Sequence, residues 1–480
     1  MDKQTISLLR TQCYVDGQWV GEPSLAVTDP ATGSTVAKVP MLDGKATRLA
    51  IAAAERALPA WSKMLAKDRA RILRRWYDLM VEHADELALL MTREQGKPLA
   101  EAKGEVLYAA SFIEFFSEEA KRIYGETIPT PKADARIVCI KQPVGVVAAI
   151  TPWNFPAAMI TRKAGPALAV GCTIIVKPAS ETPLTALALA ELGERAGIPK
   201  GVLNVITGRA SVIGAELTAS DAVRMLTFTG STEIGRVLMS ECAPTIKKLG
   251  LELGGNAPFI VFDDADLPKA VQGAMASKYR NAGQTCVCAN RIYVQDGVYD
   301  KFAELLAAEV KKLKVGPGTE SGVSTGPLIN MAAVEKVEEH IADATGKGAK
   351  VVIGGKRHKL GGNFFEPTVL TGVTTEMKVA REETFGPVAP LFRFKTEEEA
   401  IKLANDTEFG LAAYFYSRDI GRCWRVGEGL EYGIIGINEG IISNEVAPFG
   451  GVKQSGLGRE GSHHGVEEYL EIKYMLMGGV

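Results

Sequence analysis

The first extended pattern along the chain is helical. Between residues 45 and about 122, apolar side chains recur every three or four positions, as at Leu73, Trp76 and Met80, and glycine and proline are scarce. From Val144 the pattern changes to short β-branched runs that alternate with Ala- and Leu-rich segments of helical length, which indicates βαβ units in a parallel sheet. The predicted strands are 144–150, 172–176, 201–206 and 223–228, and the predicted helices are 157–170, 183–196 and 211–218.

A second α/β region follows Gly254-Gly255 and extends to about residue 455. The double glycine is either a hinge between domains or an ordinary turn. Two further stretches, 126–143 and 466–477, alternate apolar and polar residues, and a strand in the second would leave an apolar edge that a neighbouring subunit can cover. The predicted strands of the second region are 258–262, 290–294, 349–353, 389–394 and 412–416.

Composition narrows the class of protein. A chain of 480 residues is too long for one hydrophobic core and predicts two or three domains, and its 46% hydrophobic and 23% charged residues are typical of globular proteins. With 55 basic and 57 acidic residues the net charge is −2, which argues against nucleic acid or anionic lipid as a partner.

Targeting and metal signals are not found in the sequence. No apolar run reaches the ~20 residues of a membrane span, and the first residues do not show the pattern of a secretory signal, so no membrane partner is expected. The seven cysteines are spread along the chain as in a protein of the reducing cytoplasm. The five histidines do not fall at ligand spacing with cysteines, so no metal site is expected.

Two polar turns follow predicted strands of the first region. FTGSTEIG (228–235) places Gly230 and Ser231 before a helix, whose N-terminus presents free N–H groups to phosphate. KPASETP (177–183) places Lys177 and Ser180 after the carboxyl end of a strand, where open parallel sheets bind ligands. Neither segment is the G-x-G-x-x-G fingerprint, and an ordinary turn with a solvated lysine would look the same.

A third turn, TPWNFP (151–156), places Asn154 among prolines and aromatic residues. Pro156 suits the first turn of the following helix, where its missing N–H group is not needed. On that helix, Met159 and Arg162 lie three positions apart on a face that can point into a pocket. Asn154 can equally cap the turn, and Arg162 can equally form a structural ion pair.

Two further segments contain candidate reactive groups. RNAGQTCVCAN (280–290) surrounds Cys286 with small residues that leave room for a substrate, although most single cysteines are core residues. The spacing to Cys288 does not fit a zinc site but allows a labile disulfide. In ELGGNAP (252–258), Glu252 stands among apolar residues, where burial would raise its pKa toward that of a general base; a surface carboxylate is the alternative.

Together and in this order, these segments resemble the aldehyde dehydrogenase superfamily. Further matches are EETFGP (382–387), Asn438 and PFGGVKQSGLGREG (448–461), and the resemblance begins at YVDGQWV (14–20) and extends to the tail. The longest matches are similar to members that oxidise succinate semialdehyde with NADP in 4-aminobutyrate degradation. The resemblance implies an α/β fold with a Rossmann-like cofactor domain (1–122 and 144–251), a catalytic domain (252–455) and a small β element for oligomerisation (123–143 and 456–480).

The resemblance also implies roles for individual residues. Cys286 is the nucleophile, and the side chain of Asn154 with the Cys286 backbone N–H forms the oxyanion hole. Glu252 deprotonates the water that hydrolyses the thioester, and the thiol is activated either by Glu252 through a water or by the positive nicotinamide ring. Cofactor contacts are implied for Trp153, Lys177, Ser180, Gly230, Ser231, Leu253, Glu383 and Phe385.

Substrate and cofactor preference follow from particular positions. Arg162, Arg280 and Ser443 match the residues with which relatives hold a substrate carboxylate. Many relatives that use NAD have glutamate where this chain has Ser180, so NADP is preferred and NAD remains possible, with the neighbouring Glu181 able to weaken the preference. Glutarate semialdehyde is the alternative substrate, because one methylene discriminates only ~10–200-fold. A homo-oligomer, dimer or tetramer, is expected.

Two other enzyme classes and a non-enzymatic role are possible alternatives. A thiol acyltransferase or thioester hydrolase would use Cys286 and Glu252 without redox chemistry, but it has no need of two phosphate-binding turns. An acylating dehydrogenase that passes the thioester to coenzyme A needs no hydrolytic base such as Glu252. A structural protein that retains the fold would leave these residues without a purpose.

Overall fold

The N-terminal region is helical as predicted. The computed structural model describes residues 6–480. Two hairpins that the sequence analysis did not predict precede the helices, and the first turns at Asp16-Gly17, both with positive φ, as in tight two-residue hairpin turns. The strands are β1 (Cys13–Val15), β2 (Gln18–Val20), β3 (Pro23–Thr28) and β4 (Thr35–Pro40), and the helices are α1 (Gly44–Lys63), α2 (Ala66–Glu82), α3 (Ala84–Gln95) and α4 (Leu99–Glu119).

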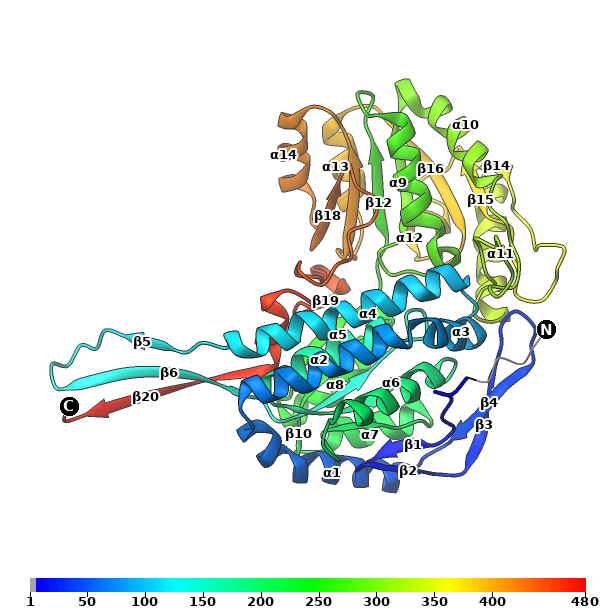
Figure 1. Ribbon diagram of the computed structural model, residues 1–480. Coiled ribbons are helices and arrows are strands. Elements are labelled where there is room, and N and C mark those ends of the chain that lie inside the picture. The colour runs from blue at the N-terminus through cyan, green and yellow to red at the C-terminus, as the bar shows by residue number, and fades with distance from the viewer. Residues whose placement is uncertain (1–5) are drawn as a thin grey trace.

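An eight-stranded sheet contains all four strands predicted in the first region, in the order β19-β11-β10-β7-β8-β9-β1-β2. Strands β7 to β11 pair in parallel, and helices cover both faces of the sheet (Figure 1). The strands not yet given are β7 (Val146–Ile150), β8 (Thr173–Lys177), β9 (Leu203–Val205), β10 (Val223–Thr229), β11 (Lys248–Glu252) and β19 (Gly456–Leu457). The helices between them are α5 (Ala158–Val170), α6 (Pro183–Ala196), α7 (Ala210–Ala219) and α8 (Thr232–Cys242).

The strand order reverses at β7. The chain passes from β7 outward to β8 and β9 and then returns to β10 on the other side of β7. The carboxyl ends of β10, β7 and β8 therefore lie side by side and are followed by Gly230, Thr151 and Pro178. Such a reversal leaves a crevice in which open α/β sheets bind their ligands.

A seven-stranded sheet forms the second region, in the order β14-β15-β16-β13-β12-β17-β18. Helices α9 and α10 cover one face, and α11 to α14 pack in a separate core. The sequence analysis missed β15 and β18, which are only four residues long. The strands are β12 (Ala257–Val261), β13 (Ala289–Gln295), β14 (Lys350–Ile353), β15 (Thr368–Thr371), β16 (Val388–Phe394), β17 (Ala412–Tyr416) and β18 (Ile434–Ile437). The helices are α9 (Leu267–Tyr279), α10 (Tyr299–Val310), α11 (Met331–Gly346), α12 (Lys378–Arg381), α13 (Glu397–Asn405) and α14 (Ile420–Gly429).

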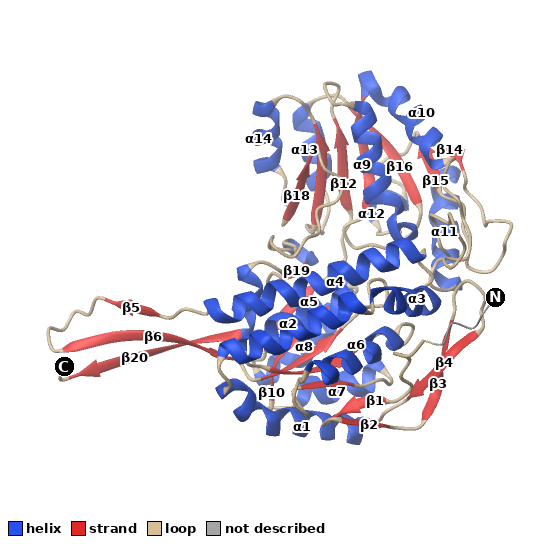
Figure 2. Cartoon of the chain, viewed as in Figure 1, coloured by secondary structure: helices blue, strands red, loops and turns tan. Residues whose placement is uncertain are grey.

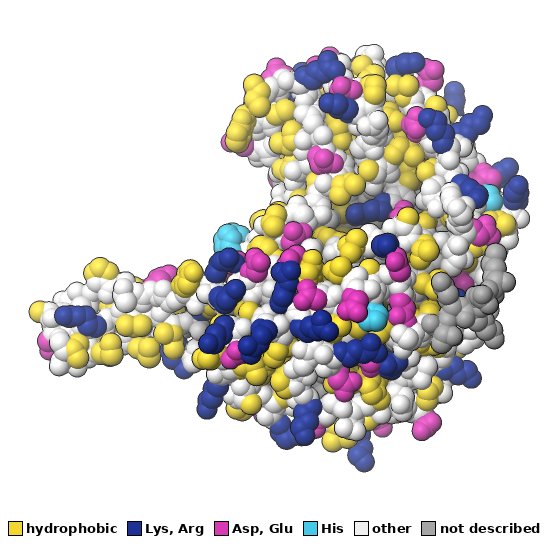
Figure 3. Space-filling model, in the orientation of Figure 1, with side chains coloured by type: hydrophobic (Ala, Val, Ile, Leu, Met, Phe, Trp, Pro, Cys, Tyr) yellow, Lys and Arg dark blue, Asp and Glu magenta, His cyan; other side chains and the backbone are white. Residues whose placement is uncertain are grey.

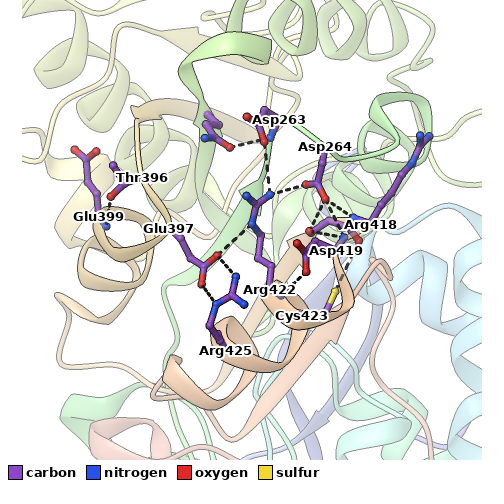
Figure 4. Close-up of polar contacts among 12 residues, drawn as sticks. Asp263, Asp264, Thr396, Glu397, Glu399, Arg418, Asp419, Arg422, Cys423 and Arg425 are labelled. Atoms are coloured by element: carbon purple, nitrogen blue, oxygen red, sulfur yellow. Dashed lines mark hydrogen bonds and ion pairs between the residues drawn. The ribbon is translucent and has the colours of Figure 1, made fainter.

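An ion-pair network fixes α14 to the rest of this sheet (Figure 4). The Arg422 guanidinium lies 2.8 Å from Asp264, beyond the end of β12, and 3.2 Å from Glu397 on α13. Asp264 also accepts the backbone N–H groups of Arg418 and Asp419 at the start of α14. Because these contacts join three elements, the outer face of α14 is held rigidly at the edge of the sheet.

A narrow arm of strands projects from the body (Figure 2). It contains β5 (Glu126–Ile128), β6 (Ala135–Pro143) and β20 (Leu470–Gly478) in the order β20-β6-β5. The tail strand is shorter than predicted, because residues 463–469 form a 3-10 helix that packs on α5. Residues 456–457, which were predicted to belong with the tail, pair instead with β11 of the eight-stranded sheet.

Two further observations concern the helices. No helix within residues 6–480 is long and apolar enough to cross a membrane. On α8, Leu238 and Cys242 are buried, whereas Ile234 and Val237 are exposed.

Candidate functional site

A cavity of about 390 Å³ lies where the carboxyl ends of strands in the eight-stranded sheet approach the amino ends of strands β12, β13 and β16 in the seven-stranded sheet. Its wall is formed by the turns after β7, β10 and β11, the segment before β13, and the start of α11 with the loop after α12. The volume is in the range of small-molecule sites. The predicted site residues that line it are Trp153, Asn154, Gly230, Ser231, Leu253, Cys286, Glu383 and Phe385.

The cavity distinguishes the two candidate cysteines. Cys286 is half-buried and lines it, whereas Cys288 is fully buried with its Sγ 3.3 Å from the carbonyl oxygen of Lys278. Gly255 lets the loop approach, because a Cβ there would lie 2.7 Å from the Cys286 carbonyl oxygen. The double glycine is therefore a tight packing turn. Burial raises the pKa of the Cys286 thiol to about 12, although Arg162 opposes the shift, so the resting group is a thiol that needs activation.

Asn154 connects the two sheets at this point. Its side-chain Nδ2 donates to the carbonyl oxygen of Gln284, two residues before Cys286, at 3.1 Å. One amide hydrogen remains for a ligand. Asn281 also donates to the Asn154 carbonyl oxygen at 3.0 Å, and Asn281 adopts a positive φ of 51° in the turn that leads to the cysteine. Asn154 is thus fixed beside the Cys286 loop.

A buried ion pair that sequence reasoning missed supports Asn154. The Lys97 ammonium donates to the Asn154 carbonyl oxygen at 2.8 Å and pairs with Glu105, and both side chains are 1% exposed. Glu105 accepts the N–H groups of Ala157 and Ala158 at the start of α5, at 2.9 and 3.3 Å. In the sequence these charges look like any surface pair on a helix, so nothing marked them.

Glu252 is buried at the end of β11, close to the cavity but outside its wall. Neither of its carboxylate oxygens has a hydrogen-bond partner within residues 6–480. A Cβ at Gly450 would lie 2.9 Å from Oε1, so glycine leaves the space that the carboxylate needs. Burial raises the pKa of Glu252 well above its ordinary value, and nearby Glu460 adds to the shift. A carboxylate with a raised pKa is a stronger base than an exposed one.

Glu460 is a second buried carboxylate that sequence reasoning did not single out, although it lies in the matched segment 448–461. It pairs with Lys163 and, at 2.8 Å, with Arg162, both on α5. Lys163 also donates to the Thr227 hydroxyl at 3.0 Å. These partners hold the pKa of Glu460 below its usual value despite burial, so Glu460 stays charged and disfavours a second charge on Glu252.

The predicted cofactor residues lie along the crevice at the strand reversal. Lys177 ends β8 and is 4% exposed, and burial lowers its pKa. Ser180 follows in an exposed turn outside the cavity wall. Among residues 6–480, Glu383 accepts a hydrogen bond only from the Gly255 N–H, at 3.3 Å, and burial raises its pKa to about 7. Lys336 at the start of α11 also lines the cavity, and no motif in the sequence indicated it.

The predicted carboxylate-binding residues lie outside the wall of this cavity, and Arg162 and Arg280 are close enough to Cys286 for their charges to act on its thiol. The Arg162 guanidinium stacks 3.9 Å from the Phe449 ring, and its Nη2 atom is buried without a hydrogen-bond partner in the described chain. Arg280 is half-buried above the Phe155 ring at 5.3 Å, and Ser443 is half-buried on the loop after β18. The structural ion pair considered for Arg162 therefore exists, with Glu460, and it leaves one donor atom free.

Comparison with known proteins decides the family. The model of the aldehyde dehydrogenase family matches residues 18–475. The chain belongs to this family. It is 67% identical to the Escherichia coli succinate-semialdehyde dehydrogenase [NADP(+)] GabD, with 98% of each chain covered, and 66% identical to a Pseudomonas aeruginosa glutarate-semialdehyde dehydrogenase, with 100% of each covered. A crystal structure of an E. coli NADP-dependent enzyme superposes with a TM-score of 0.98 at 66% identity and 99% coverage of both chains.

The protein is thus an aldehyde dehydrogenase and an oxidoreductase, and its fold is the fold of that family, as the sequence predicted. The residues of this aldehyde dehydrogenase fit a nicotinamide nucleotide. The Lys177 ammonium is buried and forms no ion pair within residues 6–480, and the half-buried Glu383 carboxyl accepts a single long hydrogen bond among the same residues. A phosphate suits the first and ribose hydroxyls suit the second.

Proposed function

We propose that this aldehyde dehydrogenase oxidises succinate semialdehyde to succinate with NADP, through a covalent intermediate on Cys286. Among the comparisons, the names of the relatives support a semialdehyde with a terminal carboxylate. The observation that carries the proposal is the buried Nη2 of Arg162, which has no hydrogen-bond partner among residues 6–480, with Arg280 as a second cation that also acts on the Cys286 thiol. Measurement of NADPH formation at 340 nm with this substrate tests it.

The first step is attack by Cys286. The thiol first loses its proton, either through a water to Glu252 or because a positive nicotinamide ring would lower its pKa. Its Sγ then bonds to the aldehyde carbon, and the carbonyl oxygen takes the electron pair of the broken π bond. The free amide hydrogen of Asn154 and the Cys286 backbone N–H are placed to bind this oxyanion, and one such donor is worth ~3–4 kcal/mol of transition-state stabilisation. Trp153, Glu383 and Phe385 would hold a nicotinamide, which would supply the hydride acceptor. Loss of hydride from the same carbon converts the adduct to a thioester.

Glu252 then acts as the general base. Its raised pKa makes the carboxylate a stronger base than an exposed one, and it takes a proton from the water that attacks the thioester. The C–S bond breaks, the acid leaves, and the Cys286 thiolate regains a proton. Lys163 and Arg162 keep Glu460 ionised beside it, which tunes the basicity of Glu252 without contact to the substrate.

The distal carboxylate of the substrate needs a desolvated cationic partner. Guanidinium groups offer two parallel donors to a carboxylate, whereas lysine offers a point charge. Arg162 cannot turn freely, because Glu460 and Phe449 hold it. Arg280 is the less constrained of the two, so we assign it the outer contact and Arg162 the inner one, with Ser443 beside them. Glutarate semialdehyde, one methylene longer, is the second candidate because a relative of similar identity is named for it.

Replacement of Arg280 by alanine tests this pocket. We expect kcat/KM for succinate semialdehyde to fall ~10–150-fold, because a hydrogen bond to a charged group contributes ~1.5–3 kcal/mol. The kcat/KM for butanal, which carries no carboxylate, should fall only slightly. Arg280→Lys should recover only part of the loss, since lysine keeps the charge but not the paired donors.

The same comparison with Arg162→Ala is less clean, because this change also breaks the ion pair with Glu460. It should slow both aldehydes, and succinate semialdehyde more. If Arg280→Ala slowed both substrates alike, the assignment of a carboxylate site would be wrong.

The preference for NADP is proposed from the turn after β8. Lys177 can pair with the 2′-phosphate, and Ser180 in the same turn puts no carboxylate against that phosphate. Ser180→Glu should move the ratio of kcat/KM values from NADP toward NAD by like-charge repulsion. Ser180→Gln is the matched control, with nearly the same size and no charge, and should shift the ratio less. An unchanged ratio in Ser180→Glu would remove this residue from the cofactor site.

We also propose that the enzyme is a homo-oligomer, a dimer or a tetramer. Figure 3 shows hydrophobic side chains along the arm and over α14. On the tail strand Ile472 is 72% exposed, and on α14 Trp424 is 67% exposed beside an apolar hollow of about 490 Å³. Both surfaces border strands with a free edge, β20 and β18, which a second copy can cover. A monomer mass in light scattering would contradict this.

A further inference from the structure

Tyr108 on α4 has a hydroxyl group that nothing described so far uses. Its oxygen is sealed from solvent and has no hydrogen-bond partner among residues 6–480. Buried hydroxyls are nearly always hydrogen-bonded, so an unpartnered one indicates a ligand or a water in the native complex. The ring is held firmly, edge-on to Phe112 at 5.0 Å and an angle of 74°.

Contacts one turn to either side show which way Tyr108 faces. Glu105, three residues earlier, binds the N–H of Ala157 at the start of α5 at 2.9 Å. Phe112, four residues later, has its ring centroid 5.5 Å from the Arg162 guanidinium carbon. Residues three and four apart share one face of a helix, so Tyr108 faces α5 between these two contacts.

The charges around the hydroxyl are those of the proposed substrate pocket. Among the charged groups, Arg162 and Arg280 have the largest effect on the pKa of the Tyr108 hydroxyl, followed by Glu460 and the Cys286 thiol. Ser111, three residues further along the same helix, contacts the loop that contains Ser443: its hydroxyl lies 3.2 Å from the Glu445 carboxylate. The unpartnered hydroxyl is thus near both arginines and the reacting sulfur.

We propose that the Tyr108 hydroxyl donates a hydrogen bond to the distal carboxylate of the substrate and thereby helps to determine specificity. This rests on the proposed function, in which Arg162 and Arg280 hold that carboxylate. Burial raises the pKa of the phenol, so it remains protonated at neutral pH and can donate. A neutral donor beside two cations satisfies a further lone pair of the carboxylate without adding charge to the pocket.

The test removes the hydroxyl alone. Tyr108→Phe keeps the ring and its contact with Phe112. We expect kcat/KM for succinate semialdehyde to fall about 10- to 100-fold, mostly through a higher KM, because the carboxylate contact is the same in the ground state and the transition state. Inhibition by succinate should weaken by a similar factor. The kcat/KM for butanal should change less than about 3-fold. Tyr124→Phe is the matched control, on an exposed tyrosine outside the site, and should change neither substrate.

The outcomes separate this inference from the function on which it rests. If the wild-type enzyme did not prefer succinate semialdehyde to butanal, the proposed substrate and the role of Tyr108 would both be wrong. If the preference existed, and Arg280→Ala removed it while Tyr108→Phe kept it, only the role of Tyr108 would be wrong. Equal losses for both aldehydes in Tyr108→Phe would also overturn the inference, since the hydroxyl would then support the fold or the reacting carbon.

Discussion

Replacing Cys286 by alanine is expected to reduce aldehyde oxidation by ~10⁴-fold or more, the scale found when a covalent nucleophile is removed. The sulfur forms the only bond between enzyme and substrate in the proposed mechanism, and alanine offers no replacement. Binding of NADP, followed by fluorescence or calorimetry, should be retained because Lys177, Ser180 and Glu383 lie on other segments. A stopped assay with mass spectrometry should also show that no acyl adduct accumulates.

Cys288→Ala is the matched control for this change. The two cysteines are two residues apart, but Cys288 is buried outside the cavity and its thiol lies against a backbone carbonyl. It should keep wild-type kcat within about 3-fold at a temperature where the protein is folded. Full activity in Cys286→Ala with loss in Cys288→Ala would reverse the assignment.

Replacing Glu252 by glutamine is expected to stall the enzyme after the first turnover. Glutamine fits the space beside Gly450 but cannot accept a proton, so thioester hydrolysis should slow ~10²–10⁴-fold. A rapid-mixing experiment should show a burst of NADPH of about one per active site and then a slow steady state. A burst that is itself slowed would show that Glu252 also activates the thiol. Steady-state turnover within about 3-fold of wild type would exclude it as the base.

The pH dependence has a definite sign. Glu252 must be ionised to act as a base, and burial and Glu460 raise its pKa. The rate of thioester hydrolysis should therefore fall as the pH drops through that raised pKa, beginning at a higher pH than an ordinary carboxyl would give. This fall in rate on the acidic side of the pH profile should be missing in Glu252→Gln. A profile of kcat against pH that was the same in both proteins would assign the fall to another group.

Much of the fold could be predicted from local patterns. Helix α6 and strand β17 were predicted at their observed bounds because Pro183, Gly197 and an unbroken apolar run mark their ends. Strands β15 and β18 were missed because the threonines at both ends of β15 and Gly436 within β18 interrupt the apolar run that marks the equally short β14. The start of the tail was predicted as strand but folds as a 3-10 helix, because Val466 and Tyr469 pack into the core of the first sheet.

Some residues of the candidate site could be predicted from the sequence, and others could not. Cys286, Asn154 and Glu252 stand in segments of unusual composition, and the structure brings them together. Glu105 and Tyr108 were missed because they lie on a helix whose sequence looks ordinary, and Lys97 was missed in the short loop just before it. Their significance comes from tertiary contacts with α5 and the Cys286 loop, and no local spacing encodes such contacts. The ion pair between Arg162 and Glu460 joins residues almost 300 positions apart and is equally invisible in the sequence.

The most direct test of the central claim is a steady-state comparison of the purified wild-type enzyme at 340 nm with NADP. The kcat/KM for succinate semialdehyde is measured against that for butanal, which has the same chain length but no carboxylate. The proposed pocket predicts that the semialdehyde is preferred by at least ~10-fold, because two arginines pair with its carboxylate in a dry site. Equal values for the two aldehydes, or no NADPH from the semialdehyde, would contradict the proposed function.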